Sequence, residues 1–344
     1  MSRGYRERVA EFFVIAEQLF ARRASLDRNS RAVYMRFKQL GHEWREREMM
    51  SKLAIGMPVY ERTEYLAEAF KSLKNQTYCD FIVFFSDNCS STNLKKVFDD
   101  CVGDDPRFIY NRLENSVPIA ENFWRTFYNT NSRFFMWAAD DDRWHPNFVA
   151  AAIEKLESEE HPDAWFCNIE SINGDGAISR NHFSLQKFSS TEHKNLDLLR
   201  YIFEPEFMGK ANLFYSVFAR EALASEIERW RKTGLDFWGS DIVFIFGFLS
   251  RFSIFIDERV MFQKRNPGAM EYARILKPRF YIYPSSQRRA YFHGYVAAVD
   301  NKALVRLALV LRCASDVIYK MYIKLTFQKT KTASPMGNGI EPSF

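Results

Sequence analysis

The chain has 344 residues, of which 47% are hydrophobic and 16% aromatic, with 33 Phe among them. This composition excludes a disordered chain, and the length suits one large domain or two small ones. The formal net charge of +5 is too small for a chain of this length to indicate nucleic-acid binding.

Residues 1–50 are rich in Arg, Glu and Ala, and apolar residues such as Phe12, Phe13 and Leu19 recur at helical spacing. We therefore predict a helical N-terminal extension. From Leu53 onwards, short apolar runs alternate with helical segments. The runs that we predict as strands are "LAIGM", "FIVFFS", "RFIYN", "RFFMWA" and "AWFCNI". Strands that alternate with helices require crossover connections, which predicts an α/β sheet whose strands are buried on both faces.

A turn cluster, "INGDGAI", interrupts this rhythm after the fifth strand and divides the predicted α/β domain of residues 51–270 into halves 51–170 and 171–270. Beyond it we predict further helices and a strand at "FSIFID". Residues 285–328 show a helical pattern with an apolar side and a strong excess of Lys and Arg, so we predict a basic amphipathic helical region there. The small polar residues of 329–344 predict a flexible tail.

Three clusters of polar residues follow predicted strands, and in an open α/β sheet ligands bind outside the carboxyl ends of the strands. In "GMPVYER", Pro58, Tyr60 and Glu61 precede a helix. In "FFSDNCSSTN", a buried strand leads directly to Asp87. A carboxylate at that point suits hydrogen bonds from a nucleobase or a sugar. The alternative is that these polar residues only cap the next helix.

The third cluster is the run Asp140, Asp141 and Asp142 in "FFMWAADDDRWHP". Adjacent carboxylates at the end of a buried strand repel one another and have raised pKa values unless a cation compensates them. Mg²⁺ or Mn²⁺ suits such oxygen donors and keeps coordination positions open for phosphate, whereas no His/Cys set indicates zinc. The alternative is a solvated acidic turn. No "GxxxxGK" or "GxGxxG" occurs, which removes the commonest ATPase and dinucleotide-binding interpretations.

The order "MPVYER", "SDNCSSTN" and "RFFMWAADDDRWHPNFV" resembles the family 2 glycosyltransferases of GT-A fold. The resemblance is strong from about Leu53 to Val149 and weaker up to about Gly268. It implies an α/β fold with a GT-A, Rossmann-like mixed sheet flanked by helices, here with helical extensions at both ends. It also implies transfer of a sugar from a nucleotide diphospho-sugar with inversion at the anomeric carbon.

The resemblance assigns roles residue by residue. The donor-binding opening of the family falls on Pro58, Tyr60 and Glu61, and its uracil-binding Asp falls on Asp87. Its metal motif, counted back from Pro146, ends on Asp141 and begins on Ala139, which departs from the usual Asp. Because Ala139 has no carboxylate, the resemblance does not say which residue of the acidic run makes the second contact with the metal. We take Asp142 as the second metal ligand and Asp140 as a donor-binding residue.

The family also uses a catalytic base near the start of a helix in its second half, and "DFWGSDIVF" places Asp241 there, with Asp236 as the nearby competitor. The alternative role of Asp241 is to interact with the helix dipole. Downstream, "FQKRNPGAM" resembles the basic segment that meets the diphosphate, for which we take Arg265, with Lys264 next to it. A solvated basic loop is the alternative.

These assignments predict a Mn²⁺- or Mg²⁺-dependent hexosyltransferase or related enzyme that uses a UDP-sugar and a glycan or lipid-linked glycan acceptor in cell-surface polysaccharide synthesis. Ala139 and Ser240 keep open a non-catalytic sugar-nucleotide-binding or scaffold protein. Five cysteines without metal spacing and no apolar run of about 18 residues predict a cytoplasmic location. The basic C-terminal helix predicts contact with the inner face of a membrane, or else packing on the catalytic domain or in a homo-oligomer.

Overall fold

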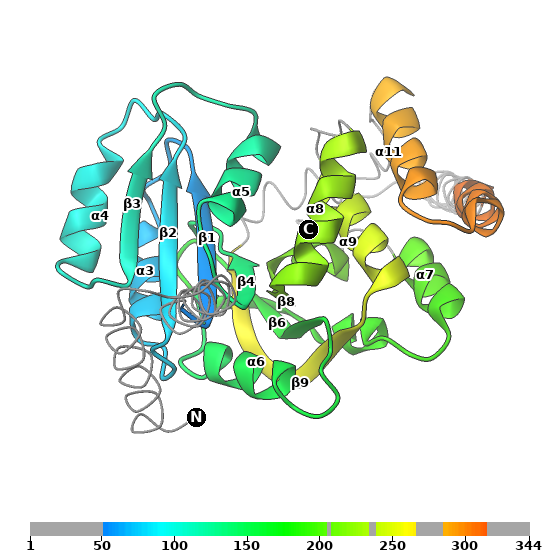
Figure 1. Cartoon of the computed structure of the whole chain (residues 1–344), viewed down its shortest axis with the longest axis horizontal. Coiled ribbons are helices and arrows are strands. Elements are labelled where there is room, and N and C mark those ends of the chain that lie inside the picture. The colour runs from blue at the N-terminus through cyan, green and yellow to red at the C-terminus, as the bar shows by residue number, and fades with distance from the viewer. Residues whose placement is uncertain (1–50, 205–207, 234–238, 266–284, 315–344) are drawn as a thin grey trace, which may run out of the picture.

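The computed structural model describes residues 51–204, 208–233, 239–265 and 285–314. The predicted N-terminal extension and the predicted tail lie outside these ranges. A nine-stranded sheet forms the centre of the molecule, in the order β3-β2-β1-β4-β8-β6-β9-β5, with β7 paired to β6. The predicted mixed α/β sheet flanked by helices is confirmed (Figure 1).

The first half of the sheet is built from crossover units. Its elements in chain order are β1 (Leu53–Val59), α3 (Leu66–Lys74), β2 (Phe81–Asp87), α4 (Leu94–Val102), β3 (Phe108–Arg112), α5 (Ile119–Tyr128) and β4 (Phe134–Trp137). The pairs β1–β2, β2–β3 and β1–β4 are all parallel. Their carboxyl ends therefore meet at one edge of the sheet, where each of the three polar clusters begins.

Helices cover both faces of these strands, because successive residues of a strand point to opposite faces. Phe85 of β2 contacts Phe70 of α3 and Phe98 of α4. The next residue, Ser86, donates a hydrogen bond to Asn122 of α5 at 2.6 Å. On that second face, a Cβ at Gly56 would lie 2.3 Å from the Oγ1 atom of a threonine in α5. A glycine in β1 therefore allows α5 to approach the sheet closely.

The second half adds antiparallel pairing. Its elements are β5 (Arg143–Trp144), α6 (Phe148–Leu156), β6 (Ala164–Ile172), β7 (Ile178–His182), η1 (Phe183–Phe188), α7 (Lys194–Phe203), η3 (Lys210–Tyr215), β8 (Val217–Ala219), α8 (Arg220–Thr233), α9 (Ser240–Arg251), β9 (Ile254–Arg265) and α11 (Ser285–Ala297). Strand β8 is antiparallel to both β4 and β6, and it joins the two halves into one sheet.

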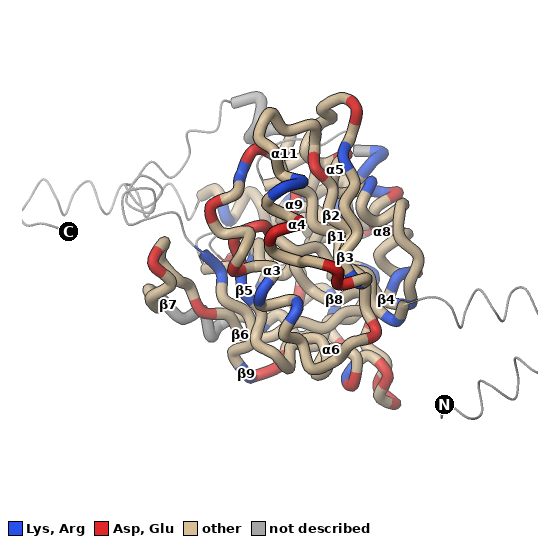
Figure 2. Tube along the Cα trace, turned by 90° about the vertical axis from the view of Figure 1, so that its left-hand side faces the viewer, with Lys and Arg blue, Asp and Glu red and all other residues tan. Residues whose placement is uncertain are grey.

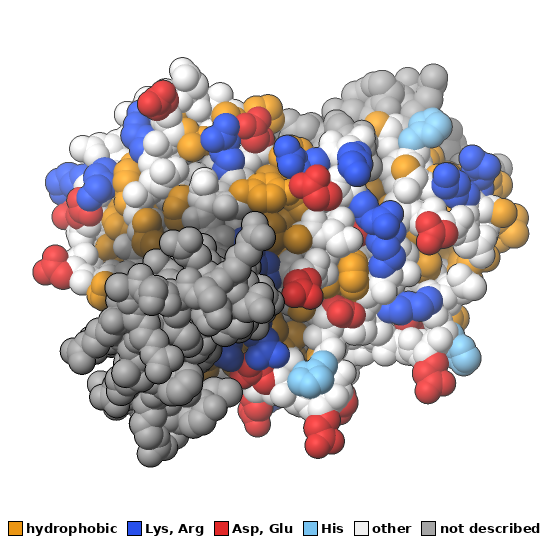
Figure 3. All heavy atoms as spheres, viewed as in Figure 1, with side chains coloured by type: hydrophobic (Ala, Val, Ile, Leu, Met, Phe, Trp, Pro, Cys, Tyr) orange, Lys and Arg blue, Asp and Glu red, His pale blue; other side chains and the backbone are white. Residues whose placement is uncertain are grey.

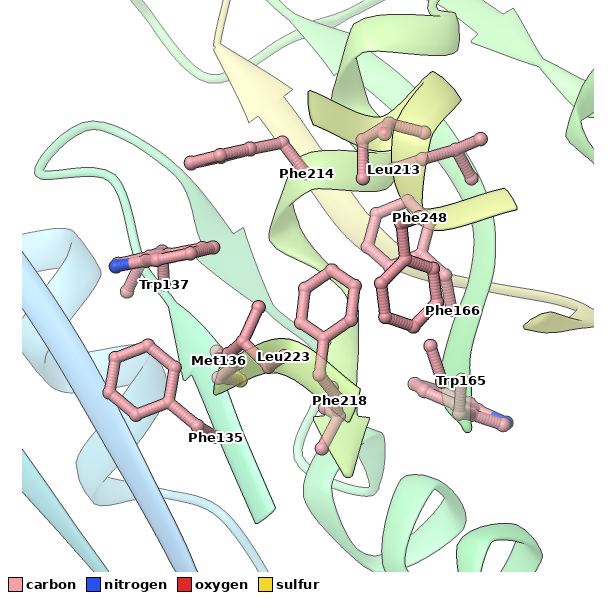
Figure 4. Packing of buried hydrophobic residues seen from close by; sticks show 14 of the residues in the cluster. Phe135, Met136, Trp137, Trp165, Phe166, Leu213, Phe214, Phe218, Leu223 and Phe248 are labelled. Carbon is pink, nitrogen blue, oxygen red and sulfur yellow. The ribbon is translucent and has the colours of Figure 1, made fainter. Parts of the chain in front are cut away.

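An aromatic core also links the two halves. The Trp137 ring of β4 stacks on the Phe214 ring of η3, with centroids 4.5 Å apart and planes 4° apart, and Phe244 of α9 meets Trp137 edge-on. Figure 4 shows Trp137 and Phe214 among the buried side chains where β4 meets the elements of the second half. Burying a large aromatic side chain contributes about 1.5–3 kcal/mol. This core therefore fixes η3 and α9 against the strand that carries the acidic run.

The C-terminal region contains two helices within 285–314, α11 and residues 302–314, separated by a break at 298–301. Val305, Ala308 and Leu309 of the second helix are buried, whereas Leu307, Val310 and Leu311 are exposed. In the described residues, no helix combines the length and the apolar character needed to cross a membrane. On the face seen in Figure 2, acidic and basic positions are interspersed along the chain.

Candidate active site

Asp87 lies at the carboxyl end of β2 and is completely buried. Its Oδ1 accepts a hydrogen bond from the Ser90 backbone N–H at 2.8 Å, and its Oδ2 accepts from the Tyr110 hydroxyl at 2.7 Å and the Arg112 guanidinium at 2.8 Å. Arg112 is the register partner of Asp87 on β3, which explains this pairing. The predicted uracil-binding residue is thus held rigidly, beside an arginine side chain that is 46% exposed.

Glu61 connects the loops that follow β1 and β2. Its backbone has a φ of 60°, an unusual conformation for a residue other than glycine. Its carboxylate accepts hydrogen bonds from the backbone N–H groups and hydroxyls of Ser91 and Thr92, which lower its pKa to about 2, the Ser91 N–H most. Glu61 therefore shapes the predicted nucleoside loop with a carboxylate that is already engaged. Next to it, the Tyr60 side chain is 54% exposed.

The three acidic residues after β4 each meet a basic residue. Arg62 donates from Nε to Asp140 at 2.9 Å, and its Nη1 lies 3.3 Å from Asp141. Asp142 is completely buried and accepts hydrogen bonds from the Lys264 ammonium at 2.9 Å and the Arg265 backbone N–H at 3.0 Å. In this structure, the positive charges of Arg62 and Lys264 compensate the negative charge of the three aspartates.

Strand pairing explains why Lys264 reaches Asp142. Strands β5 and β9 are antiparallel, with Arg143 opposite Gln263 and Trp144 opposite Phe262. The next position along this register sets Asp142 opposite Lys264. The two residues are 122 positions apart in the chain, so no local pattern in the sequence connects them.

Burial dominates the electrostatics of the acidic run. It raises the pKa of Asp142 to about 6, although the Lys264 charge opposes this shift. It also raises the pKa of Asp140 against the effect of Arg62. Burial on its own lowers the pKa of Lys264, but Asp142, Tyr215 and Asp141 raise it by more, so Lys264 remains a cation at neutral pH. These carboxylates are therefore sensitive to any further cation that enters the site.

Arg265, the predicted diphosphate ligand, has its guanidinium committed elsewhere. The side chain is 2% exposed, and it donates to the backbone carbonyls of Asp141, Asn173 and Gly174 and to the Glu68 carboxylate. It also packs over a tyrosine ring at 4.0 Å. Of the two adjacent basic residues, Lys264 is the one whose charged group forms ion pairs with the carboxylates of the acidic run. Arg265 secures the backbone around them.

Asp241 lies in the first turn of α9, after Gly239, whose φ is 92°. Burial raises the pKa of Asp241 to about 6, while the Lys264 charge lowers it. Tyr215 connects this carboxylate with the acidic run. Burial raises the pKa of Tyr215 to about 12, the charges of Asp142, Asp141 and Asp241 raise it further, and the Lys264 charge opposes the shift. The Lys264 ammonium lies 4.9 Å from the Tyr215 ring centroid.

The structure thus brings the predicted base into the electrostatic environment of Lys264, to which Asp141 and Asp142 also belong. The competing candidate Asp236 lies outside the described residues. Sequence reasoning missed Tyr215 and Arg62 as site residues. In the sequence, only their positions could have indicated this role. Arg62 directly follows the "PVYE" cluster, and Tyr215 lies just before β8.

A divalent cation has one clear point of attachment. Among the described residues, no group of three or more His, Cys, Asp or Glu side chains forms a metal cage. However, the Oδ1 atom of Asp141 is buried without a hydrogen-bond partner. Mg²⁺ is commonly held by one or two carboxylates together with substrate phosphates. Asp141 fits that arrangement, whereas the Asp142 oxygens already accept hydrogen bonds from Lys264 and Arg265.

Two comparisons with known proteins found matches to this chain. The family model for glycosyl transferase family 2 matches residues 54–220. This segment is a glycosyltransferase family 2 domain. It runs from β1 through the acidic run to β8, and so contains Asp87 and Asp141, while Asp241 and Lys264 follow it in the chain.

Similar solved structures include those of TarS residues 1–349 from S. aureus. The complex with UDP-GlcNAc is 15% identical, with a TM-score of 0.54 over 75% of this chain and 70% of that chain. The complex with UDP is 14% identical, with a TM-score of 0.52 over 75% and 69%. At this identity the likeness establishes a shared fold. No curated protein matches this chain in sequence.

Proposed function

We propose that the protein is an inverting glycosyltransferase that moves a sugar from a UDP-sugar to an acceptor hydroxyl. The observation that carries this proposal is the shared electrostatic environment of Asp141, whose buried Oδ1 has no hydrogen-bond partner, and Asp241, whose pKa is raised to about 6. Both belong to a chain with a family 2 domain. Uridine as the nucleoside is supported by the TarS complexes with UDP-GlcNAc and UDP.

The proposed reaction is a single displacement. Asp241 takes the proton from the acceptor hydroxyl while the acceptor oxygen attacks the anomeric carbon. The bond to the diphosphate breaks as the new bond forms, and the electron pair leaves with UDP. Arg62 and Lys264 supply positive charge beside the leaving group. Asp141 would hold Mg²⁺ or Mn²⁺, which would stabilise charge on the diphosphate, whereas the Asp142 oxygens are occupied by Lys264 and Arg265.

Release of nucleoside diphosphate from a panel of UDP-, dTDP- and GDP-sugars tests this function. We expect UDP-sugars to bind and to release UDP, faster with Mn²⁺ or Mg²⁺ than with EDTA. Saturable binding of a UDP-sugar without UDP release, in the presence of a broad set of acceptors, would instead support the non-catalytic scaffold. Absence of binding to the whole panel would refute both functions.

We also propose that the protein contacts an anionic membrane, where a lipid-linked glycan acceptor would lie at the cytoplasmic face. The support is the helix at 302–314, which exposes 58% of Leu307, 65% of Val310 and 52% of Leu311. Lys302 and Arg306 are exposed on the same helix. Apolar and basic side chains together are typical of helices that bind membrane surfaces.

In a sedimentation assay with vesicles that contain anionic lipid, Leu307→Ser combined with Leu311→Ser is expected to reduce the bound fraction several-fold. The matched control is Ile109→Ser, which changes an exposed apolar residue of β3. Equal sedimentation of the helix variant and the parent would reject the membrane role. A change of oligomeric state in the variant would assign this face to a second subunit instead.

A further inference from the structure

A cavity of about 390 Å³ lies between α8, α9 and α11. This volume falls within the range of about 300–1,000 Å³ that is usual for small-molecule sites. We call it the three-helix groove. The residues that line it are Glu226, Arg229, Trp230, Lys232, Val243, Phe244, Ala290, His293, Gly294, Ala297 and Ala298.

The inner surface of the three-helix groove is apolar. Trp230 of α8 and Val243 and Phe244 of α9 supply large side chains that are at least 95% buried. The lining residues of α11 other than His293 are Ala or Gly, which leave room beside that helix. An aromatic surface of this kind suits the apolar face of a sugar ring.

The one acidic residue of the lining is already neutralised. The Glu226 side chain is 3% exposed, and its Oε2 accepts a hydrogen bond from Nε of Arg251 at 3.1 Å. Its other oxygen lies against the α9 backbone, since a Cβ at Gly247 would come within 2.2 Å of Oε1. The charge of Glu226 is therefore used within the fold.

The rim of the three-helix groove is basic. Arg229, Lys232 and His293 are all exposed. In the part of the chain that the structure describes, neither Arg229 nor Lys232 forms an ion pair, whereas their neighbour Arg231 pairs with Glu228. Figure 3 shows Lys and Arg side chains over α8 on this face of the molecule, with acidic side chains among them. Two exposed cations without a direct ion pair, beside an apolar floor, indicate a ligand that carries negative charge.

We infer that the three-helix groove binds an anionic group, a phosphate or a carboxylate, on the sugar acceptor. This inference rests on the proposed function, because it assigns the groove to the acceptor side of that reaction. Val243 and Phe244 follow Asp241 by two and three residues on α9. Residues three apart on a helix are neighbours on one face, with Cβ atoms roughly 5–6 Å apart, so Phe244 lies beside the proposed base, whereas Val243 points away from it. The groove is therefore adjacent to the base on the element that carries both.

Calorimetric titration with simple anionic and neutral sugars tests the inference. We expect glucose 6-phosphate or glucuronate to bind, and methyl glucoside to bind at least tenfold more weakly. Arg229→Gln combined with Lys232→Gln is expected to weaken anion binding about tenfold or more. Added salt is also expected to weaken anion binding to the parent protein, because it screens the charges. Quenching of tryptophan fluorescence by the anion is expected to fall in Trp230→Phe, which locates the bound sugar.

The matched control is Lys95→Gln combined with Lys96→Gln, which removes two exposed charges of α4. Stronger binding of the phosphate or of the carboxylate identifies which anion the groove prefers. Lack of saturable anion binding, equal binding of methyl glucoside, or equal affinity in the α8 variant would overturn the inference. UDP binding is measured in the same preparations. If the protein did not bind UDP, the proposed sugar transfer would be rejected. Anion binding that is present in the parent and lost in the α8 variant would still show that the groove binds anions.

Discussion

Asp241→Asn is expected to lower the rate of sugar transfer by about 10²- to 10⁴-fold while the affinity for UDP stays within about twofold of the parent. The amide keeps the size of the side chain at the start of α9 but does not accept the acceptor proton. The measurements are kcat for transfer and Kd for UDP by calorimetry. Asp99→Asn, at an exposed position of α4, is the matched control. Transfer by Asp241→Asn at the parent rate would show that another group is the base.

The same assignment fixes the direction of the pH dependence. Burial raises the pKa of Asp241 to about 6, so the carboxylate needed to accept a proton is lost as the pH falls through 6. The transfer rate is expected to fall tenfold per pH unit below about 5.5 and to be constant above about 7. Asp142 also has a pKa of about 6, beside Lys264. UDP affinity measured over the same pH range separates the two, because Asp241 affects transfer alone.

The sheet edge that carries the site was predictable because its signals are local. Short apolar runs marked β1, β2, β3, β4 and β6, and polar residues that follow such runs fall at the carboxyl ends of parallel strands. The positions of Asp87 and of the acidic run follow from that pattern, and the family resemblance singles out Asp141 within the run. Their partners do not, because they arrive through strand register. Arg112 is opposite Asp87 on β3, and Lys264 continues the pairing of β9 with β5.

The choice between Lys264 and Arg265 shows this limit clearly. Composition indicates a basic segment but does not say which of two adjacent residues faces the acidic run. Successive side chains of a strand point in opposite directions, so only one of them can do so. The register gives that place to Lys264 and turns the Arg265 guanidinium towards Glu68 and backbone carbonyls.

The break in the C-terminal helical region is the opposite case, since a local signal for it was present and was not used. Residues 285–328 were predicted as one helical region, and the described part breaks at 298–301. The Asn301 side chain accepts a hydrogen bond from the Leu304 backbone N–H at 3.3 Å. Asn is a preferred residue before the first turn of a helix. "VDNKALV" therefore contained a helix start that apolar periodicity alone does not reveal.

Asp141→Ala is expected to weaken UDP binding in the presence of Mn²⁺ by about tenfold or more and to lower kcat by about 10²-fold or more. Asp141 is the acidic residue of the run with a buried oxygen that has no hydrogen-bond partner, so its removal deletes the available metal ligand. In EDTA, the parent and the variant should bind UDP with similar affinity. The experiment therefore distinguishes loss of a metal ligand from general damage to the site.

Asp142→Asn is the informative comparison for that result. Asp142 contacts Lys264 and the Arg265 N–H directly. The neutral Asn side chain therefore weakens the contact with the Lys264 ammonium at neutral pH, whether or not a metal is bound. Its effect on UDP affinity is expected to persist in EDTA, unlike that of Asp141→Ala. If both variants lost the same affinity with and without Mn²⁺, the run would act through Arg62 and Lys264 alone. The assignment of Asp141 as metal ligand would then be wrong.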